Sequence, residues 1–140
     1  MIVRGFARAT TASTLLGIGA LHVAWGRGTT FPFPTRDRLN DVVVGRAATP
    51  SPAACYGVAG LLAAAAGLVA GLPTPHSRLR QTGVCTVALT LATRAALGFS
   101  GKTELVSPGS ASPTFLRMDR RVFSPLCAAL AIGAVASLRS

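Results

Sequence analysis

Residues 81–101 read QTGVCTVALTLATRAALGFSG, an uncharged stretch interrupted by a single charged side chain, Arg94. The part before Arg94 covers about 13 residues, whereas a helix needs roughly 20 to cross about 30 Å of hydrocarbon. We therefore expect one transmembrane helix that continues through Arg94 to about residue 101. A guanidinium at that depth is costly and usually faces the interior of a helix bundle. The stretch thus predicts a membrane protein in which a polar or acidic group pairs with Arg94.

The composition of the whole chain agrees with a membrane protein. Of 140 residues, 50% are hydrophobic and only 13% are charged, while soluble domains average about 25% charged residues. The formal net charge of +10 is spread as single basic residues between apolar runs, and few aromatic side chains could stack on bases. We expect no nucleic-acid partner, because attraction to the anionic headgroups of a lipid bilayer accounts for the charge.

Cysteine and histidine usage argues against a metal or redox site. Cys55, Cys85 and Cys127 form no CxxC pair, and His22 and His76 are far apart in the chain. Such a set provides no ligand cluster for zinc and no dithiol. We expect no metal and no cofactor, and all three cysteines as small buried apolar side chains.

Three more uncharged runs complete the predicted fold, a single domain over residues 1–140. The four helices are expected at about 9–26, 53–72, 81–101 and 122–138. The first lacks the small-residue cleavage site of a signal peptide, so we predict an uncleaved span. Ser124-Pro125 predicts an N-cap and first helical position for the last helix, with Val122 and Phe123 completing the crossing. The predicted fold is all-α: an up-and-down four-helix transmembrane bundle with two long loops at one pole.

The predicted topology suggests a partner for Arg94. The ends of helices one and three meet the starts of helices two and four at one pole. Asp119 is the predicted counter-ion, through a bidentate bond that offsets the cost of burial. The rivals of Asp119 are Asp37, Asp41 and Glu104. The alternatives are that Asp119 pairs with the neighbouring Arg120 or Arg121, and that Arg94 snorkels to the interface. The opposite pole carries basic residues, among them Arg78 and Arg80, and is expected to anchor in the headgroups.

The same pole contains the candidate functional residues. His22 and Trp25 share a helix face, where they form either a proton carrier with a pocket wall or an ordinary interfacial pair. In a catalytic site His22 would serve as acid or base and Arg94 would bind an anion or oxyanion, with Asp119 as the third candidate catalytic residue. The candidate pocket residues are Trp25, Tyr56, Phe99, Ser124 and Cys127.

Four short motifs are expected at this pole: His22-x-x-Trp25-Gly26, Arg94-x-x-x-Gly98-Phe99, Phe115-x-x-x-Asp119 and Ser124-Pro125-Leu126-Cys127. With these motifs in this order, the chain resembles a family of small bacterial four-helix membrane proteins catalogued only as a domain of unknown function. The resemblance implies the fold and the shared polar pole, and it brings no activity with it.

Three functions remain open from the sequence. The first is a scaffold or accessory subunit, in which His22, Arg94 and Asp119 form a network that fixes helix register, with a membrane protein partner or a second copy of the chain. The second is a membrane-embedded enzyme for a lipid-soluble substrate. The third is a small transporter, which would need oligomerisation because the chain has no internal repeat.

The expected location is the cell (inner or plasma) membrane, as a multi-pass protein. Roughly eight basic residues lie on the long-loop side and roughly five on the other, which by number places the loops inside. Per residue, the short segments on the other side are more densely basic. We expect both termini in the cytoplasm.

Overall fold

The computed structural model describes residues 2–74 and 76–138, with side chains from residue 5 onward. Within these residues all regular structure is helical, which confirms the all-α prediction. The long helices are α1 (Ile2–Gly26), α3 (Pro52–Ala70), α4 (Arg78–Phe99) and α6 (Ser124–Ala136). The short elements are α2 (Arg36–Leu39), the π-helical turn η1 (Asn40–Val44), the 3₁₀ turn η2 (Thr103–Leu105), α5 (Pro113–Met118) and the π-helical turn η3 (Asp119–Phe123).

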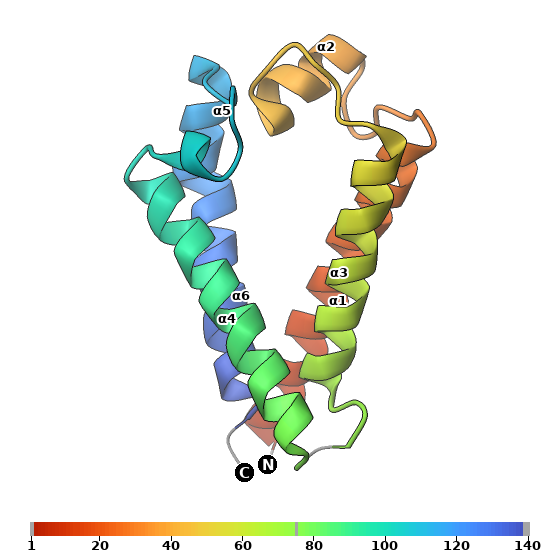
Figure 1. Ribbon diagram of the computed structural model, residues 1–140, viewed down its shortest axis with the longest axis vertical. Helices are drawn as coiled ribbons and strands as arrows, with labels where there is room; N and C mark the ends of the chain where they lie inside the picture. The colour runs from red at the N-terminus through yellow and green to blue at the C-terminus, as the bar shows by residue number, and fades with distance from the viewer. Residues whose placement is uncertain (1, 75, 139–140) are drawn as a thin grey trace.

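The long helices form two pairs that diverge along the molecule. Helix α1 runs beside α3, and α4 runs beside α6 (Figure 1). The pairs approach one another at the end where both termini lie, which we call the terminal end. They separate toward the loop end, where α2, η1 and α5 lie, and α5 packs against η1 there. The loop end corresponds to the pole at which the sequence gathers its polar residues.

The hydrophobic core occupies the part of the molecule where the two pairs converge. Its members come from all four long helices and include Leu15, Val69, Val84, Leu130 and Ala134, each at most 5% exposed. Between α1 and α6 a glycine is required, because a Cβ on Gly133 would overlap Thr11 Oγ1. Small residues of this kind allow close helix approach.

The last helical segment begins earlier than the sequence predicts. Ser112 is the N-cap: its hydroxyl accepts from the Phe115 backbone N–H, and Pro113 follows as the first helical residue. From there the chain stays helical through α5, η3 and α6. Ser124 has helical backbone angles (φ −69°, ψ −44°), so its predicted role as N-cap is wrong. The π turn η3 ends at Phe123, and Pro125, which cannot donate a backbone hydrogen bond, is the second residue of α6.

One of the three cysteines departs from its expected environment. Cys55 is buried and Cys127 is half-buried, but Cys85 is exposed, so the prediction of a buried side chain is wrong there. The buried face of α4 carries Val84 and Ala88. Cys85 is turned about 100° from Val84 around the helix axis, which takes its side chain away from the core.

Among the residues that the structure describes, two helices are long and apolar enough to cross a membrane, judged by length and composition. They are α3 and α4, with mean hydropathies of 1.9 and 1.3. Only 22% of each apolar segment is buried inside the molecule, so most of their surface faces outward. Helix α1 contains several threonines as well as His22, and α6 by itself has only 13 residues.

Candidate functional site

Arg94 and Asp119 form a bidentate ion pair at the loop end. Arg94 Nη2 donates to Asp119 Oδ1 at 2.7 Å, and Nη1 donates to Oδ2 at 3.3 Å. The Asp119 side chain is 1% exposed and that of Arg94 is 27% exposed. The acid that the sequence selects as the counter-ion is therefore the one that Arg94 contacts. Asp41, one of its rivals, instead lies 3.6 Å from Arg38.

Two hydroxyl groups complete the environment of the Asp119 carboxylate. Thr103 Oγ1 donates to Oδ2, and Ser124 Oγ donates to Oδ1 at 3.3 Å. The carboxylate thus accepts four hydrogen bonds, from α4, η2 and α6. Within the described chain no buried side-chain nitrogen or oxygen lacks a partner. Thr103, which is fully buried, is a member of this network that sequence reasoning missed.

Gly98 provides the space for this network. A Cβ at this position would overlap Ser124 Oγ and lie 2.9 Å from Arg94 Nη1 and 3.0 Å from Asp119 Oδ1. Arg94 and Gly98 are four residues apart on α4, so they share one helix face. The glycine lets Ser124 of α6 approach that face closely enough to reach the carboxylate. The Arg-x-x-x-Gly spacing therefore has a steric reason.

His22 lies apart from this network. Its Nδ1 donates to the Ile18 carbonyl oxygen at 2.8 Å, because a carbonyl can only accept. The His22 and Trp25 ring centroids are 5.0 Å apart, and Trp25 Nε1 donates to the Phe31 carbonyl at 2.7 Å. Across residues 5–74 and 76–138, no hydrogen bond or ion pair links His22 with Arg94 or Asp119. His22 belongs to α1 and Arg94 to α4, and the two helix pairs diverge toward the loop end (Figure 1).

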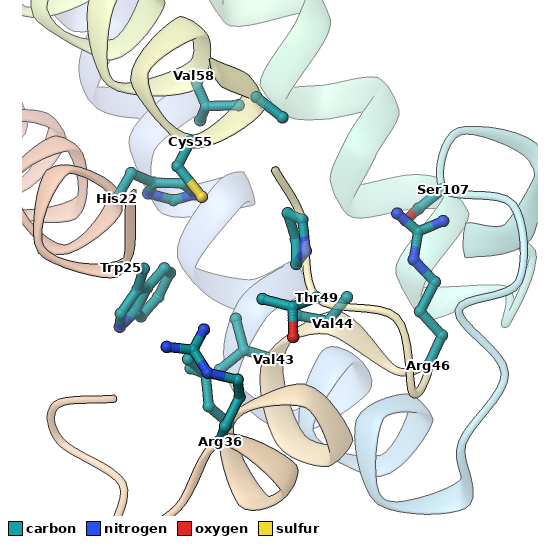
Figure 2. Close-up of a pocket in the computed structure, with 13 residues that line it drawn as sticks. His22, Trp25, Arg36, Val43, Val44, Arg46, Thr49, Cys55, Val58 and Ser107 are labelled. Carbon is teal, nitrogen blue, oxygen red and sulfur yellow. The ribbon is translucent and has the colours of Figure 1, made fainter. Parts of the chain in front are cut away.

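A cavity of about 200 Å³ lies against His22 at the loop end. Figure 2 shows His22 and Cys55 side by side in its wall, with Val43, Val44 and Thr49 across from them. Two arginines lie at its margins. The Arg36 guanidinium extends toward Trp25, and that of Arg46 extends toward Ser107 (Figure 2). None of the residues that line the cavity is acidic, so its charged side chains, Arg36 and Arg46, are both basic.

The other predicted pocket residues do not line this cavity. Tyr56 packs against the end of α1, where a Cβ on Gly26 would lie 2.8 Å from its Cε1 atom. Phe99 is half-exposed at the end of α4. Ser124 belongs to the Asp119 network, and the half-buried Cys127 follows three residues later on α6. The candidate residues are therefore divided between a cavity at His22 and a filled network at Asp119.

Arg80 is a second important residue that the sequence reasoning misplaced. It is 1% exposed, so its expected role as a headgroup anchor is wrong. Its guanidinium donates to carbonyl oxygens at the ends of two other helices, among them Leu68 of α3 at 2.8 Å and Ser137 beyond α6 at 3.0 Å. A signal was present: Ser77 caps α4 three residues earlier, and Arg80 then precedes buried Val84 by one helical turn.

Within the described residues, no three His, Cys, Asp or Glu side chains are grouped so that they could hold a metal ion. The searches of curated proteins and of solved structures return no match. A family model, described as protein of unknown function (DUF3995), matches residues 15–134. The match spans all four long helices and both the network and the cavity, and the chain therefore belongs to this family.

Proposed function

We propose that the chain is a small integral membrane protein whose four long helical segments cross the bilayer. Outward-facing apolar surface on α3 and α4 supports this, because the core helix of a soluble protein would be mostly buried. Helices α1 and α6 run beside them, and both termini lie at one end, as an even number of crossings requires. Alone, α6 spans only about 20 Å, but it is continuous with η3 and α5.

Its function in this proposal is that of a scaffold or accessory subunit in the cell membrane. The observation that carries it is the fully buried Asp119 carboxylate, which holds α4, η2 and α6 together through four hydrogen bonds. An arginine that stabilises a substrate anion needs donors directed at that substrate. Both terminal nitrogens of Arg94 are instead engaged by Asp119. The pair fixes helix register at one membrane face.

The membrane part of the proposal is tested by extraction and by reporter fusions. The protein should stay with the membrane pellet in alkaline carbonate. A cytoplasm-only reporter should be active after Ser140, and a reporter active only outside the cytoplasm should work within residues 107–112. Release of the chain into the aqueous phase would refute the membrane placement. The opposite reporter pattern would refute only the orientation.

The scaffold part is tested by purification in mild detergent at native expression level. We expect a constant stoichiometry with one membrane protein partner or with a second copy of the chain. Arg94→Met should weaken this association, because the register of α4 against α6 is lost. Arg117→Met, an exposed arginine at the same end, serves as the control and should retain the partner. A monomer with no associated protein would contradict the scaffold role.

A second candidate, an enzyme for a lipid-soluble substrate, is favoured by the cavity at His22. Nδ1 is occupied by the Ile18 carbonyl, while Nε2 has no hydrogen-bond partner in the described chain and is not buried. Nε2 is therefore the ring atom that would exchange a proton with a ligand. His22→Gln should then abolish turnover of such a substrate with no change in helical content. Retained turnover would exclude His22 as the acid or base.

A further inference from the structure

We propose that the cavity beside His22 binds an anionic amphiphile. The ligand class is a molecule with one hydrocarbon chain and a phosphate or carboxylate head. The head lies at the cavity margins that carry Arg36 and Arg46, and the chain runs along Cys55 and Val58. The depth assigned to each cavity wall rests on the proposed membrane placement. The charge and size assigned to the ligand rest on the cavity itself.

The charge of the cavity points to an anion. Arg36 and Arg46 form no ion pair within the described residues, and no acidic side chain lines the cavity. Each guanidinium has five N–H donors. Arg36 directs one of them to the Gly28 carbonyl at 2.7 Å, and Arg46 directs one to the Pro108 carbonyl at 2.8 Å. These bonds orient the two side chains and leave donors for charge-assisted bonds to a phosphate or carboxylate.

The depth of the cavity points to a hydrocarbon chain. Val58 lies six residues after Pro52, the first residue of α3, so it is about 9 Å further along the helix axis. If α3 begins at the headgroup level, Val58 lies at hydrocarbon depth. Val58 is 40% exposed, so the cavity wall continues onto the outer surface of α3. Trp25 lies between the headgroup level and the depth of Val58, at the interface where tryptophan is enriched in membrane proteins.

The size of the cavity restricts the ligand further. A volume of about 200 Å³ lies below the roughly 300–1,000 Å³ of pockets that enclose a whole drug-sized ligand. It holds a small anionic head and the first methylene groups of one chain. The remaining chain passes Val58 into the bilayer. A choline group would place a further cation beside the two arginines, so we expect a head without net negative charge to bind more weakly.

Binding is measured with the purified full chain in a neutral detergent. Trp25 is the only tryptophan and lines the cavity, so its fluorescence reports on occupancy. The probes are palmitoyl lysophosphatidic acid and palmitate, compared with palmitoyl lysophosphatidylcholine and with inorganic phosphate. We expect both anionic amphiphiles to bind at least about tenfold more tightly than either comparison probe. Equal affinity for lysophosphatidylcholine would overturn the proposed anion site, and equal affinity for inorganic phosphate would overturn the chain site.

Matched variants distinguish the cavity from general charge attraction. Arg36→Gln with Arg46→Gln should weaken lysophosphatidic acid binding about tenfold or more. Arg117→Gln with Arg121→Gln removes the same charge from a different surface, a hollow on α5 and η3, and should change the affinity less than about twofold. Equal losses in the two double variants would refute the site.

A third variant tests the chain and guards against misfolding. Val58→Phe fills the proposed chain path without changing charge, and it should weaken the palmitoyl probes while circular dichroism stays unchanged. Unchanged binding would place the ligand elsewhere. Because these measurements use detergent, they do not depend on bilayer crossing. If the chain binds the ligand but is released by alkaline carbonate, the proposed membrane function is rejected and the binding site is retained. If the chain resists carbonate but does not bind the ligand, only the binding site is rejected.

Discussion

Replacing Arg94 by methionine should destabilise the protein strongly. The substitution keeps most of the stem volume but leaves the Asp119 carboxylate, 1% exposed, with only the Thr103 and Ser124 hydroxyl donors. Removing one member of a buried ion pair costs about 3–5 kcal/mol, because the other charge remains without compensation. Asp119→Asn should cost less, about 1–3 kcal/mol, since the Arg94 side chain is 27% exposed and water can solvate its guanidinium.

The double variant provides the decisive measurement. A neutral amide needs no counter-charge, so Arg94→Met should cost only about 1 kcal/mol once Asp119→Asn is present. The two effects should therefore couple by about 2–4 kcal/mol. The free energy of unfolding is measured by titrating SDS into the detergent-solubilised protein and following helical content by circular dichroism. Membrane extraction and purification are the same for all four proteins.

Arg117→Met is the control, because Arg117 is an exposed arginine at the same end of the molecule. It should change the free energy of unfolding by no more than about 0.5 kcal/mol. If the two single changes at Arg94 and Asp119 are additive, the pair contributes no mutual stabilisation. The pair would then not fix the register of α4 against α6.

Two further predictions concern steric and capping contacts. Gly98→Ala should destabilise the protein by about 1–3 kcal/mol, because its Cβ would overlap Ser124 Oγ. Gly60→Ala should be neutral or stabilising by up to about 1 kcal/mol, because a Cβ there meets no atom within 4 Å. Equal losses of stability in SDS unfolding would contradict the packing at Gly98. Arg80→Met should lower stability by more than about 2 kcal/mol, since several carbonyls lose a charged donor. Arg78→Met, at an exposed position, should have little effect. Similar unfolding midpoints for the two variants would contradict a structural role for Arg80.

The ion pair could be predicted because few alternatives existed. Arg94 is the one charged residue in a long uncharged run, and the chain has only four acidic residues to pair with it. An alternating topology then places the start of the last helix beside the end of the helix that carries Arg94. Thr103 and the steric role of Gly98 carry no such signal. Their importance depends on contacts of a few ångströms between separate elements.

The relation between His22 and Arg94 could not be predicted by the same reasoning. Counting residues along each helix gives depth at 1.5 Å per residue, and both residues lie near the loop end. Depth says nothing about separation across the bundle, which depends on how far the two helix pairs diverge. The cavity likewise depends on where α2 and η1 lie relative to the ends of α1 and α3. That segment carries turn formers, charged side chains and three valines, with no periodic pattern that fixes its place. Local patterns specify the helices, but not the shape of what lies between them.

Arg80 and Arg94 show why two arginines of one helix need different reasoning. Arg94 interrupts an apolar run, so its burial is visible in the sequence. Arg80 stands beside Arg78 in a polar segment and resembles a loop residue. The difference is decided by Ser77, whose cap starts α4 early enough for Arg80 to align with Val84 on the buried face. Near the ends of α3 and α6, carbonyl oxygens lack intrahelical partners and attract a cation. Arg80 therefore joins the ends of α3 and α6 at the terminal end, and Arg94 joins α4 to the carboxylate of Asp119 at the loop end. The cavity lies in a part of the molecule where neither arginine links the helices.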